Sequence, residues 1–300
     1  MTGIISGIKR NAVHDGQGLR TTVFFKGCPL RCVWCHNPES IGFRQEVGFF
    51  AEKCISCGTC RTICSKGAIE IREHLPVTNR SLCSVCFGCT EMCPGDARIG
   101  YGEIWEADAL TEKLIRDKPF FDNSGGGVTL SGGECLAQPV FARELAALLR
   151  NEGISVNIDT CGYTSKSVLE QMLPLTDTFL YDIKAIDREV HIRCTGKDND
   201  CILENLRYLN DCGANIEIRY PYVPGWNDGE CEKIGVFLAG LSRKHKIKVL
   251  GYHGLADGKY KALGLPVTLP DAEVTAEDVE KAVQLLRKFG LQAVNGMQED

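Results

Sequence analysis

Cysteine spacing restricts the possible folds of this chain more than any other feature of its sequence. Eleven of the 17 cysteines among the 300 residues lie in three tight groups before residue 94. Disulfides are rare in cytosolic proteins, and secreted disulfide scaffolds are usually much shorter than this chain. Grouped cysteines in a chain of this size therefore indicate metal or cluster ligation. We expect the six scattered cysteines to be small, buried apolar side chains: Cys135, Cys161, Cys194, Cys201, Cys212 and Cys231.

The second and third groups share the spacing C-x2-C-x2-C-x3-C, and Pro94 follows the last cysteine. This is the spacing of bacterial ferredoxins, in which the fourth cysteine of each run binds the other of two 4Fe–4S clusters. A pair of zinc knuckles is the alternative, but zinc needs only four ligands per site and does not explain the third gap or the Cys-Pro pair. The pattern predicts crossed ligand sets: Cys54, Cys57, Cys60 and Cys93 for one cluster, and Cys64, Cys83, Cys86 and Cys89 for the other.

The first group, Cys28, Cys32 and Cys35, has the spacing C-x3-C-x2-C and offers only three thiolates. A 4Fe–4S cluster has four irons, so one iron would keep an open position, as catalytic metal sites do. The spacing resembles that of the radical S-adenosylmethionine (SAM) superfamily. This resemblance implies that the amino and carboxylate groups of SAM bind the open iron, and that one electron then cleaves SAM to methionine and a 5′-deoxyadenosyl radical.

Outside these groups, short apolar runs alternate with amphipathic stretches. We expect strands at residues 21–25, 127–130, 155–158, 179–183, 215–220 and 247–252, and helices between them, including 105–115, 141–151 and a last helix at 276–289 that closes the chain. Such alternation predicts parallel strands joined by right-handed crossovers. Six units fall short of a closed eight-fold barrel. We therefore predict an α/β fold, a partial (βα)6 TIM-like barrel of residues 1–47 and 101–300, with residues 48–100 inserted as an α+β ferredoxin-like domain that carries two 4Fe–4S clusters.

Polar motifs follow the predicted strands, and active sites of such barrels lie where the strands end. Taken singly, each motif has an ordinary explanation as a turn, a helix cap or a solvated charge. Their common position at one rim predicts an active site there. The motifs are Ser131-Gly132-Gly133-Glu134, Asp159-Thr160-Cys161-Gly162, Asp182 with Lys184, Arg219, and His253.

Residues 13–28 and 35–39, together with these rim motifs, are similar to the glycyl radical enzyme activating enzymes, and the insert places the chain with the larger members of that family. The resemblance covers nearly the whole chain. It departs from the family at Gln17, where proline is common, and this change should loosen a turn without removing a ligand. The resemblance implies an oxidoreductase that cleaves SAM and uses the 5′-deoxyadenosyl radical to abstract hydrogen from a backbone glycine of a partner enzyme.

The same resemblance implies roles for the rim residues. Gly132, Gly133 and Glu134 would hold the methionine amino group of SAM, and Lys184 would pair with its carboxylate. The SAM-binding residues implied are Trp34, Asn37, Gly132, Gly133, Glu134, Asp182, Lys184, Arg219 and His253. A monovalent cation would lie beside the SAM carboxylate among oxygen ligands, from Asp159, Thr160, Leu180 and Asp182. Asp15 would meet the backbone of the partner's glycine loop.

Charge and hydropathy restrict the partners. A net charge of −5 does not favour nucleic acid or anionic membranes. No apolar run approaches the roughly 18 residues of a membrane span, and residues 1–5 are too short in apolar content for a secretory signal. We expect a cytoplasmic monomer that meets a glycyl radical enzyme and takes electrons from flavodoxin or ferredoxin, relayed by the insert clusters.

Two other functions stay open. A radical SAM enzyme that acts directly on a small molecule would share the barrel and the three-cysteine loop, although residues 15–20 favour the activating enzymes. An electron-transfer protein would share the ferredoxin-like run, but it has no use for an open iron.

Overall fold

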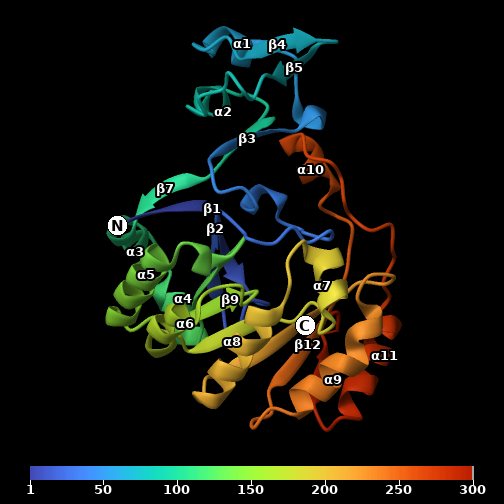
Figure 1. Ribbon diagram of the computed structural model, residues 1–300. Coiled ribbons are helices and arrows are strands. Elements are labelled where there is room, and N and C mark those ends of the chain that lie inside the picture. Colours follow the sequence, from blue (N-terminus) through green and yellow to red (C-terminus); the bar gives the residue numbers. More distant parts are fainter. Residues whose placement is uncertain (299–300) are drawn as a thin grey trace.

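The computed structural model describes residues 1–298 and is built around one open sheet of nine strands (Figure 1). Seven strands run parallel, in the spatial order β13-β12-β11-β10-β9-β8-β2, and β1 and β7 extend the β2 edge antiparallel. The strand bounds are β1 (Thr2–Ala12), β2 (Arg20–Phe25), β7 (Glu103–Glu106), β8 (Gly127–Gly132), β9 (Ser155–Thr160), β10 (Thr178–Asp182), β11 (Ile216–Tyr222), β12 (Lys246–Gly251) and β13 (Gln292–Asn295).

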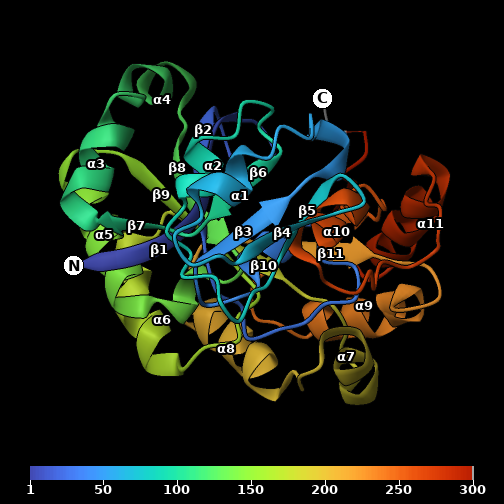
Figure 2. The same ribbon diagram turned by 90° about the horizontal axis from the view of Figure 1, so that it is seen from above.

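Amphipathic helices cover the outer face of this curved sheet (Figure 2). In α5, for example, Phe141, Leu145 and Leu149 recur at helical spacing and are buried in the main core. The helices are α3 (Ala107–Ile115), α4 (Lys118–Ser124), α5 (Pro139–Asn151), α6 (Lys166–Met172), α7 (Arg188–Thr195), α8 (Asp200–Asp211), α9 (Cys231–Ala239), α10 (Asp257–Leu263) and α11 (Ala276–Arg287), with short 3-10 turns η1 (Pro38–Ser40), η2 (Ala51–Lys53), η3 (Cys135–Ala137), η4 (Leu173–Leu175) and η5 (Asp228–Glu230).

Strand register aligns the predicted site residues at one level of the sheet. Phe25, which leads into the first cysteine loop, lies opposite Gly132 of β8. Leu180 of β10 lies opposite Asp159 of β9, and Asp182 of β10 lies opposite Arg219 of β11. Because the strands are parallel, all these residues reach the same carboxyl edge.

Three predicted elements need correction. Residues 103–106 form strand β7, so the helix expected at 105–115 begins only at Ala107. The helix expected at 276–289 ends at Arg287 and does not close the chain, because β13 follows it as a seventh parallel strand. The antiparallel β1 was also not expected. It is half-exposed along much of its length, so it lacks the continuous apolar run that marks the central strands.

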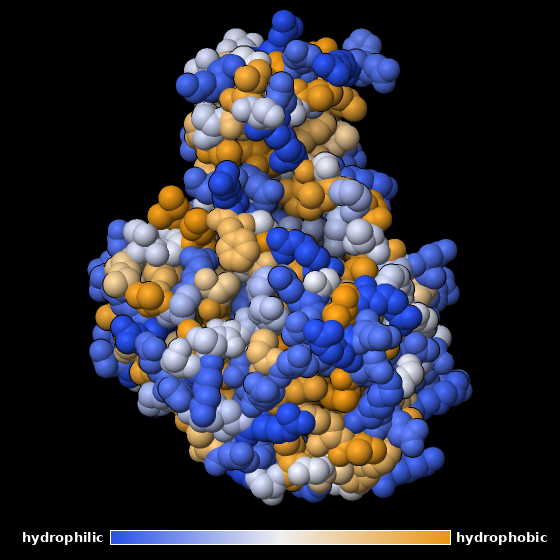
Figure 3. All heavy atoms as spheres, in the orientation of Figure 1, coloured by the Kyte–Doolittle hydropathy of each residue, from blue (hydrophilic) through white to orange (hydrophobic). Residues whose placement is uncertain are grey.

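Residues 46–101 project from the carboxyl edge of the sheet, and we call this segment the cysteine-rich head. Figure 3 shows it as a narrow lobe on a broader body. Within it β3 (Glu46–Phe49) pairs with β6 (Arg98–Tyr101), and β4 (Ile69–Arg72) pairs with β5 (Leu75–Thr78). Helix α2 (Gly88–Glu91) lies between α1 (Thr59–Ile63) and the body, as Figures 1 and 2 together show.

Candidate active site

A cavity of about 640 Å³ opens at the carboxyl edge of the parallel strands. Its wall combines the loop after β2 with the ends of β8, β9, β10 and β12. Cys28, Cys32 and Cys35 all line it. So do most of the residues expected to bind SAM or a cation: Trp34, Asn37, Gly132, Gly133, Asp159, Thr160, Asp182, Lys184 and His253. The predicted rim is therefore one concave site, the usual form of a small-molecule pocket.

Backbone hydrogen bonds hold the three-cysteine loop in place. The amide of Gly27 donates to the carbonyl of Ser40 at 2.7 Å, and the amide of Arg31 donates to the carbonyl of Thr195 at 2.7 Å. The Tyr260 hydroxyl of α10 donates to the carbonyl of Cys35 at 3.1 Å. Since these contacts use main-chain atoms of the loop, its thiols remain available to a ligand in the cavity.

The thiols differ in their electrostatic surroundings. Burial raises the pKa of Cys35 to about 11 and raises that of Cys32 further. A hydrogen bond with Cys161 lowers the pKa of Cys28. Lys184 is the nearby cation that favours all three thiolates. Three cysteines facing one cavity beside a lysine fit an iron–sulfur cluster, because its ligands must be thiolates.

Two glycines bring the end of β8 against the cysteine loop. A Cβ on Gly133 would lie 2.4 Å from the carbonyl oxygen of Ser40 and 2.6 Å from that of Gly27. Gly132 has a φ of +116° and would place a Cβ 2.2 Å from the amide nitrogen of Phe25. Only glycine allows this approach, so the Gly-Gly pair leaves bare main chain at the cavity wall.

Glu134 follows the glycines but turns its side chain away from the cavity. Its carboxylate is buried and accepts hydrogen bonds from the amides of Leu136 at 3.0 Å and Cys161 at 2.8 Å and from the Thr160 hydroxyl at 2.9 Å. Burial raises the pKa of Glu134, and these hydrogen bonds oppose the rise. The side chain therefore anchors the end of β9, and only the main chain of Glu134 is left to meet SAM.

Buried charges form a connected network behind the cavity wall. Lys184 pairs with Asp182 at 2.5 Å. Burial alone would lower the pKa of Lys184, but Asp182 raises it above its usual value. Asp159 accepts from the Ser131 hydroxyl at 2.5 Å and lies 3.5 Å from Arg219. Burial raises the pKa of Asp159 to about 6, although Arg219 acts in the opposite direction.

The expected cation ligands do not form one shell. The carboxylates of Asp159 and Asp182 are engaged as just described, and the Thr160 hydroxyl bonds to Glu134. Leu180 is buried in β10 and is absent from the cavity lining. A cation at this point would have to displace existing contacts.

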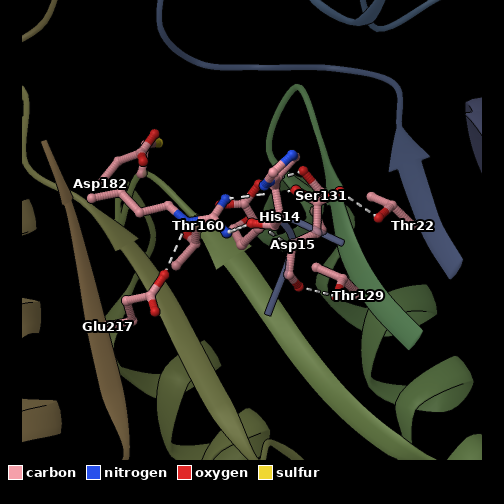
Figure 4. Close-up of polar contacts among 12 residues, drawn as sticks. His14, Asp15, Thr22, Thr129, Ser131, Thr160, Asp182 and Glu217 are labelled. Atoms are coloured by element: carbon pink, nitrogen blue, oxygen red, sulfur yellow. Dashed lines mark hydrogen bonds and ion pairs between the residues drawn. The ribbon is translucent and has the colours of Figure 1, made fainter. Parts of the chain in front are cut away.

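Asp15 lies beside the network on the loop between β1 and β2, outside the cavity lining. Thr22 donates to its carboxylate at 2.6 Å, and Thr129 donates to its carbonyl at 2.7 Å (Figure 4). Arg219 lies 3.8 Å from the other carboxylate oxygen and donates to the carbonyl of His14 at 2.7 Å. Arg219 also stands outside the lining, so it meets Asp15 rather than the cavity.

Some site residues were not expected from the sequence. Cys161 is buried, as expected of a scattered cysteine, but it also lines the cavity next to Cys28. His36 stacks on His253 with ring centroids 3.9 Å apart, and its position directly after Cys35 was the available signal. Two other scattered cysteines contradict the expectation of burial, since Cys201 is half-buried and Cys212 is exposed at the end of α8.

The head contains two smaller cavities, each ringed by four cysteines. Cys54, Cys57, Cys60 and Cys93 line one, and Cys64, Cys83, Cys86 and Cys89 line the other. These are the crossed sets indicated by the spacing. The structure therefore brings each set of four thiols around one space that a cluster could fill.

Backbone conformation repeats between the two cysteine runs of the head. Positive φ angles recur 29 residues apart, at Ser56 and Val85, at Gly58 and Phe87, and at Gly67 and Asp96. For a β-branched residue such as Val85 this region is a true outlier. Strained backbone persists where its surroundings require it, often around ligands, so both runs have the form of loops that curl around an occupant.

A model of the radical SAM superfamily matches residues 22–238. The trans-4-hydroxy-L-proline dehydratase activating enzyme of Clostridioides difficile is 40% identical over 265 residues, which cover 87% of each chain. The (2S)-3-sulfopropanediol dehydratase activating enzyme of Klebsiella oxytoca is 37% identical over 99% of this chain and 98% of its own.

Similarity to a more distant structure extends to the fold alone. SuiB of Streptococcus suis, solved with its precursor peptide SuiA, is 16% identical, with a TM-score of 0.51 over 64% of this chain and 42% of that one. No helix in the described part of the chain combines the length and apolar character that crossing a membrane requires. On its sequence matches, the chain belongs to the radical SAM superfamily and, within it, to the family of glycyl radical enzyme activating enzymes.

Proposed function

We propose that this protein generates a glycyl radical on a partner enzyme from SAM bound in the 640 Å³ cavity. The observation that carries the proposal is the convergence of Cys28, Cys32 and Cys35 on that cavity, with Asp15 at its margin. When bound to these thiolates, a 4Fe–4S cluster supplies the electron that cleaves SAM.

The chain's own groups would orient SAM. The exposed main chain at Gly132 and Gly133 offers carbonyl groups to the methionine amino group. Lys184 is the cation suited to its carboxylate, and a SAM carboxylate would share Lys184 with Asp182. Trp34, Asn37 and His253 line the remaining wall, where the ribose and adenine would lie. Asp159, Thr160, Asp182 and the Leu180 carbonyl remain the proposed cation ligands.

Asp15 would recognise the partner. One of its carboxylate oxygens accepts from Thr22, while the other has only the longer contact with Arg219. This second oxygen can accept a hydrogen bond from a backbone amide of an incoming glycine loop. A charge-assisted bond of that kind is about twice as strong as a neutral one.

The insert of residues 48–100 would hold two further 4Fe–4S clusters on the crossed cysteine sets and pass electrons to the catalytic cluster. Flavodoxin or ferredoxin would be the donor, and the protein would act as a cytoplasmic monomer. Burial of two separate spaces among four thiols each supports this part of the proposal.

Anaerobically reconstituted protein, dithionite, SAM and the glycyl radical enzyme encoded beside it provide the test. We expect a glycyl radical on the partner by electron paramagnetic resonance and 5′-deoxyadenosine by chromatography. Cys32→Ala, which removes one catalytic ligand, should give neither. A small-molecule enzyme would give 5′-deoxyadenosine with its own substrate and leave the partner diamagnetic. A pure electron carrier would form no 5′-deoxyadenosine at all.

A further inference from the structure

The cysteine-rich head repeats itself with an offset of 29 residues, and one buried position breaks the repeat. Each run ends in a strand, with Ile69 opening β4 and Arg98 opening β6. The preceding residues, Ala68 and Ala97, are both buried. Ile69 is 4% exposed and Arg98 is 3% exposed. One half of the head therefore buries a hydrocarbon where the other half buries a guanidinium.

Arg98 has few partners for so deeply buried a charge. Its Nη1 donates to the thiol sulfur of Cys89 at 3.8 Å, and its Nη2 donates to the Thr78 hydroxyl at 3.0 Å. The guanidinium lies 5.4 Å from the centre of the Phe49 ring. Its Nε is buried without a hydrogen-bond acceptor. Among the residues that the structure describes, Asp and Glu side chains make no printed ion pair with it.

A buried, unpaired cation is costly and needs a compensating negative charge. Arg98 lines both four-cysteine cavities, so that charge can come only from what the thiols hold. Four thiolates around an iron–sulfur cluster supply a net negative charge. The unsatisfied guanidinium is thus a second observation, independent of the cysteine spacing, that an anionic group occupies the head.

We propose that Arg98 makes the cluster held by Cys64, Cys83, Cys86 and Cys89 the more readily reduced of the two head clusters. This inference rests on the proposed pair of clusters in the head. Reduction adds one electron, taken from the external donor, and therefore one negative charge. A hydrogen-bonded cation at the Cys89 sulfur stabilises that charge and raises the reduction potential. Ile69, at the matched position, offers no such donor to its surroundings.

The favoured cluster lies on the side of the head that meets the body. Arg80, just before Cys83, donates to the carbonyl of Leu263 at the end of α10. From the same helix, Tyr260 donates to the carbonyl of Cys35 in the catalytic loop. Helix α2, which carries Cys89, is also the nearer of the two head helices to the body (Figure 1). An electron that enters the head would therefore rest on the cluster next to the catalytic loop.

Arg98→Ile tests this proposal, because it places the residue of the matched position into the second run. It should be made in a chain with Cys28, Cys32 and Cys35 replaced by alanine, so that only the head clusters titrate. In the parent chain, a dithionite titration followed by electron paramagnetic resonance should show two separate potentials. Arg98→Ile should lower the higher potential and bring the two together, and Arg98→Lys, which keeps the charge, should retain most of the separation.

Arg72→Ile is the matched control. Arg72 lies in the same head but is exposed and paired with Glu70, so its loss should move neither potential. Should Arg98→Ile assemble poorly, Arg98→Met keeps a longer apolar chain and serves the same comparison. About eight irons per parent chain establish the two head clusters; a parent without iron overturns the proposed clusters themselves. Eight irons with potentials that ignore the loss of Arg98 overturn the role of Arg98 alone.

Discussion

Glu134→Gln should destabilise the protein although it changes a single atom. The carboxylate accepts on both oxygens, from the Leu136 amide on one, from the Cys161 amide on the other and from the Thr160 hydroxyl on both. A glutamine amide has one oxygen, so its NH2 group must face one of these N–H donors. One buried amide then loses its acceptor.

An orphaned buried donor costs about 1–3 kcal/mol, and hydrogen bonds to a charged group contribute more than neutral ones. We therefore expect the free energy of unfolding to fall by about 3 kcal/mol. Anaerobic urea unfolding followed by tryptophan fluorescence would measure the change. Glu152→Gln, at an exposed position after α5, is the control and should stay within about 0.5 kcal/mol of the parent.

Unchanged stability in Glu134→Gln would refute the anchoring role. Weaker SAM binding without any loss of stability would go further, because it would mean that the side chain meets SAM directly. Weaker SAM cleavage together with lower stability is the expected pair of results, since Thr160 and Cys161 both line the cavity.

Four further changes test the rest of the site. Anaerobic reconstitution should give about twelve irons per chain from three 4Fe–4S clusters, and full activity near four irons would remove the head clusters from the proposal. Cys28→Ala, Cys32→Ala or Cys35→Ala should abolish 5′-deoxyadenosine formation, whereas Cys57→Ala or Cys86→Ala should mainly slow electron delivery; a normal rate in Cys32→Ala would contradict the catalytic assignment. Asp15→Asn should weaken partner activation markedly and leave partner-free SAM cleavage nearly unchanged, as measured by paramagnetic resonance and chromatography; equal loss of both would assign Asp15 to the fold. Gly133→Ala must displace the Ser40 and Gly27 carbonyls, so overpacking should cost about 1–3 kcal/mol and weaken SAM binding by calorimetry, while unchanged affinity would show that this close approach is dispensable.

The central sheet was predictable because its strands are buried on both faces and read as continuous apolar runs. Val128 and Leu130 of β8, for example, are fully buried, as are Val156 and Ile158 of β9. Strand β13 lacks this signal. It has only four residues, of which Ala293 and Asn295 are buried, and its partner β12 is distant in sequence.

The residues of the rim were predictable, but the directions of their side chains were not. Parallel strands bring their carboxyl ends to one edge, which places the motifs together without fixing where each one points. Gly132 turns the chain at a positive φ, and that turn sends the Glu134 carboxylate into the protein. Arg219 likewise faces Asp15 because of a contact between elements about 200 residues apart. Such long-range contacts have no signature in local spacing.

The charges around Arg219 explain how Asp15 can remain available to a partner. Arg219 lies within 4 Å of three carboxylates, at 3.8 Å from Asp15, 3.5 Å from Asp159 and 3.7 Å from Glu217. One cation shared among three acids cannot neutralise them all, and Asp15 has the longest of the three contacts. The margin of the cavity therefore keeps negative character, which repels an anionic small molecule and attracts backbone N–H groups. That electrostatic preference favours a peptide loop as the substrate that reaches the cavity past Asp15.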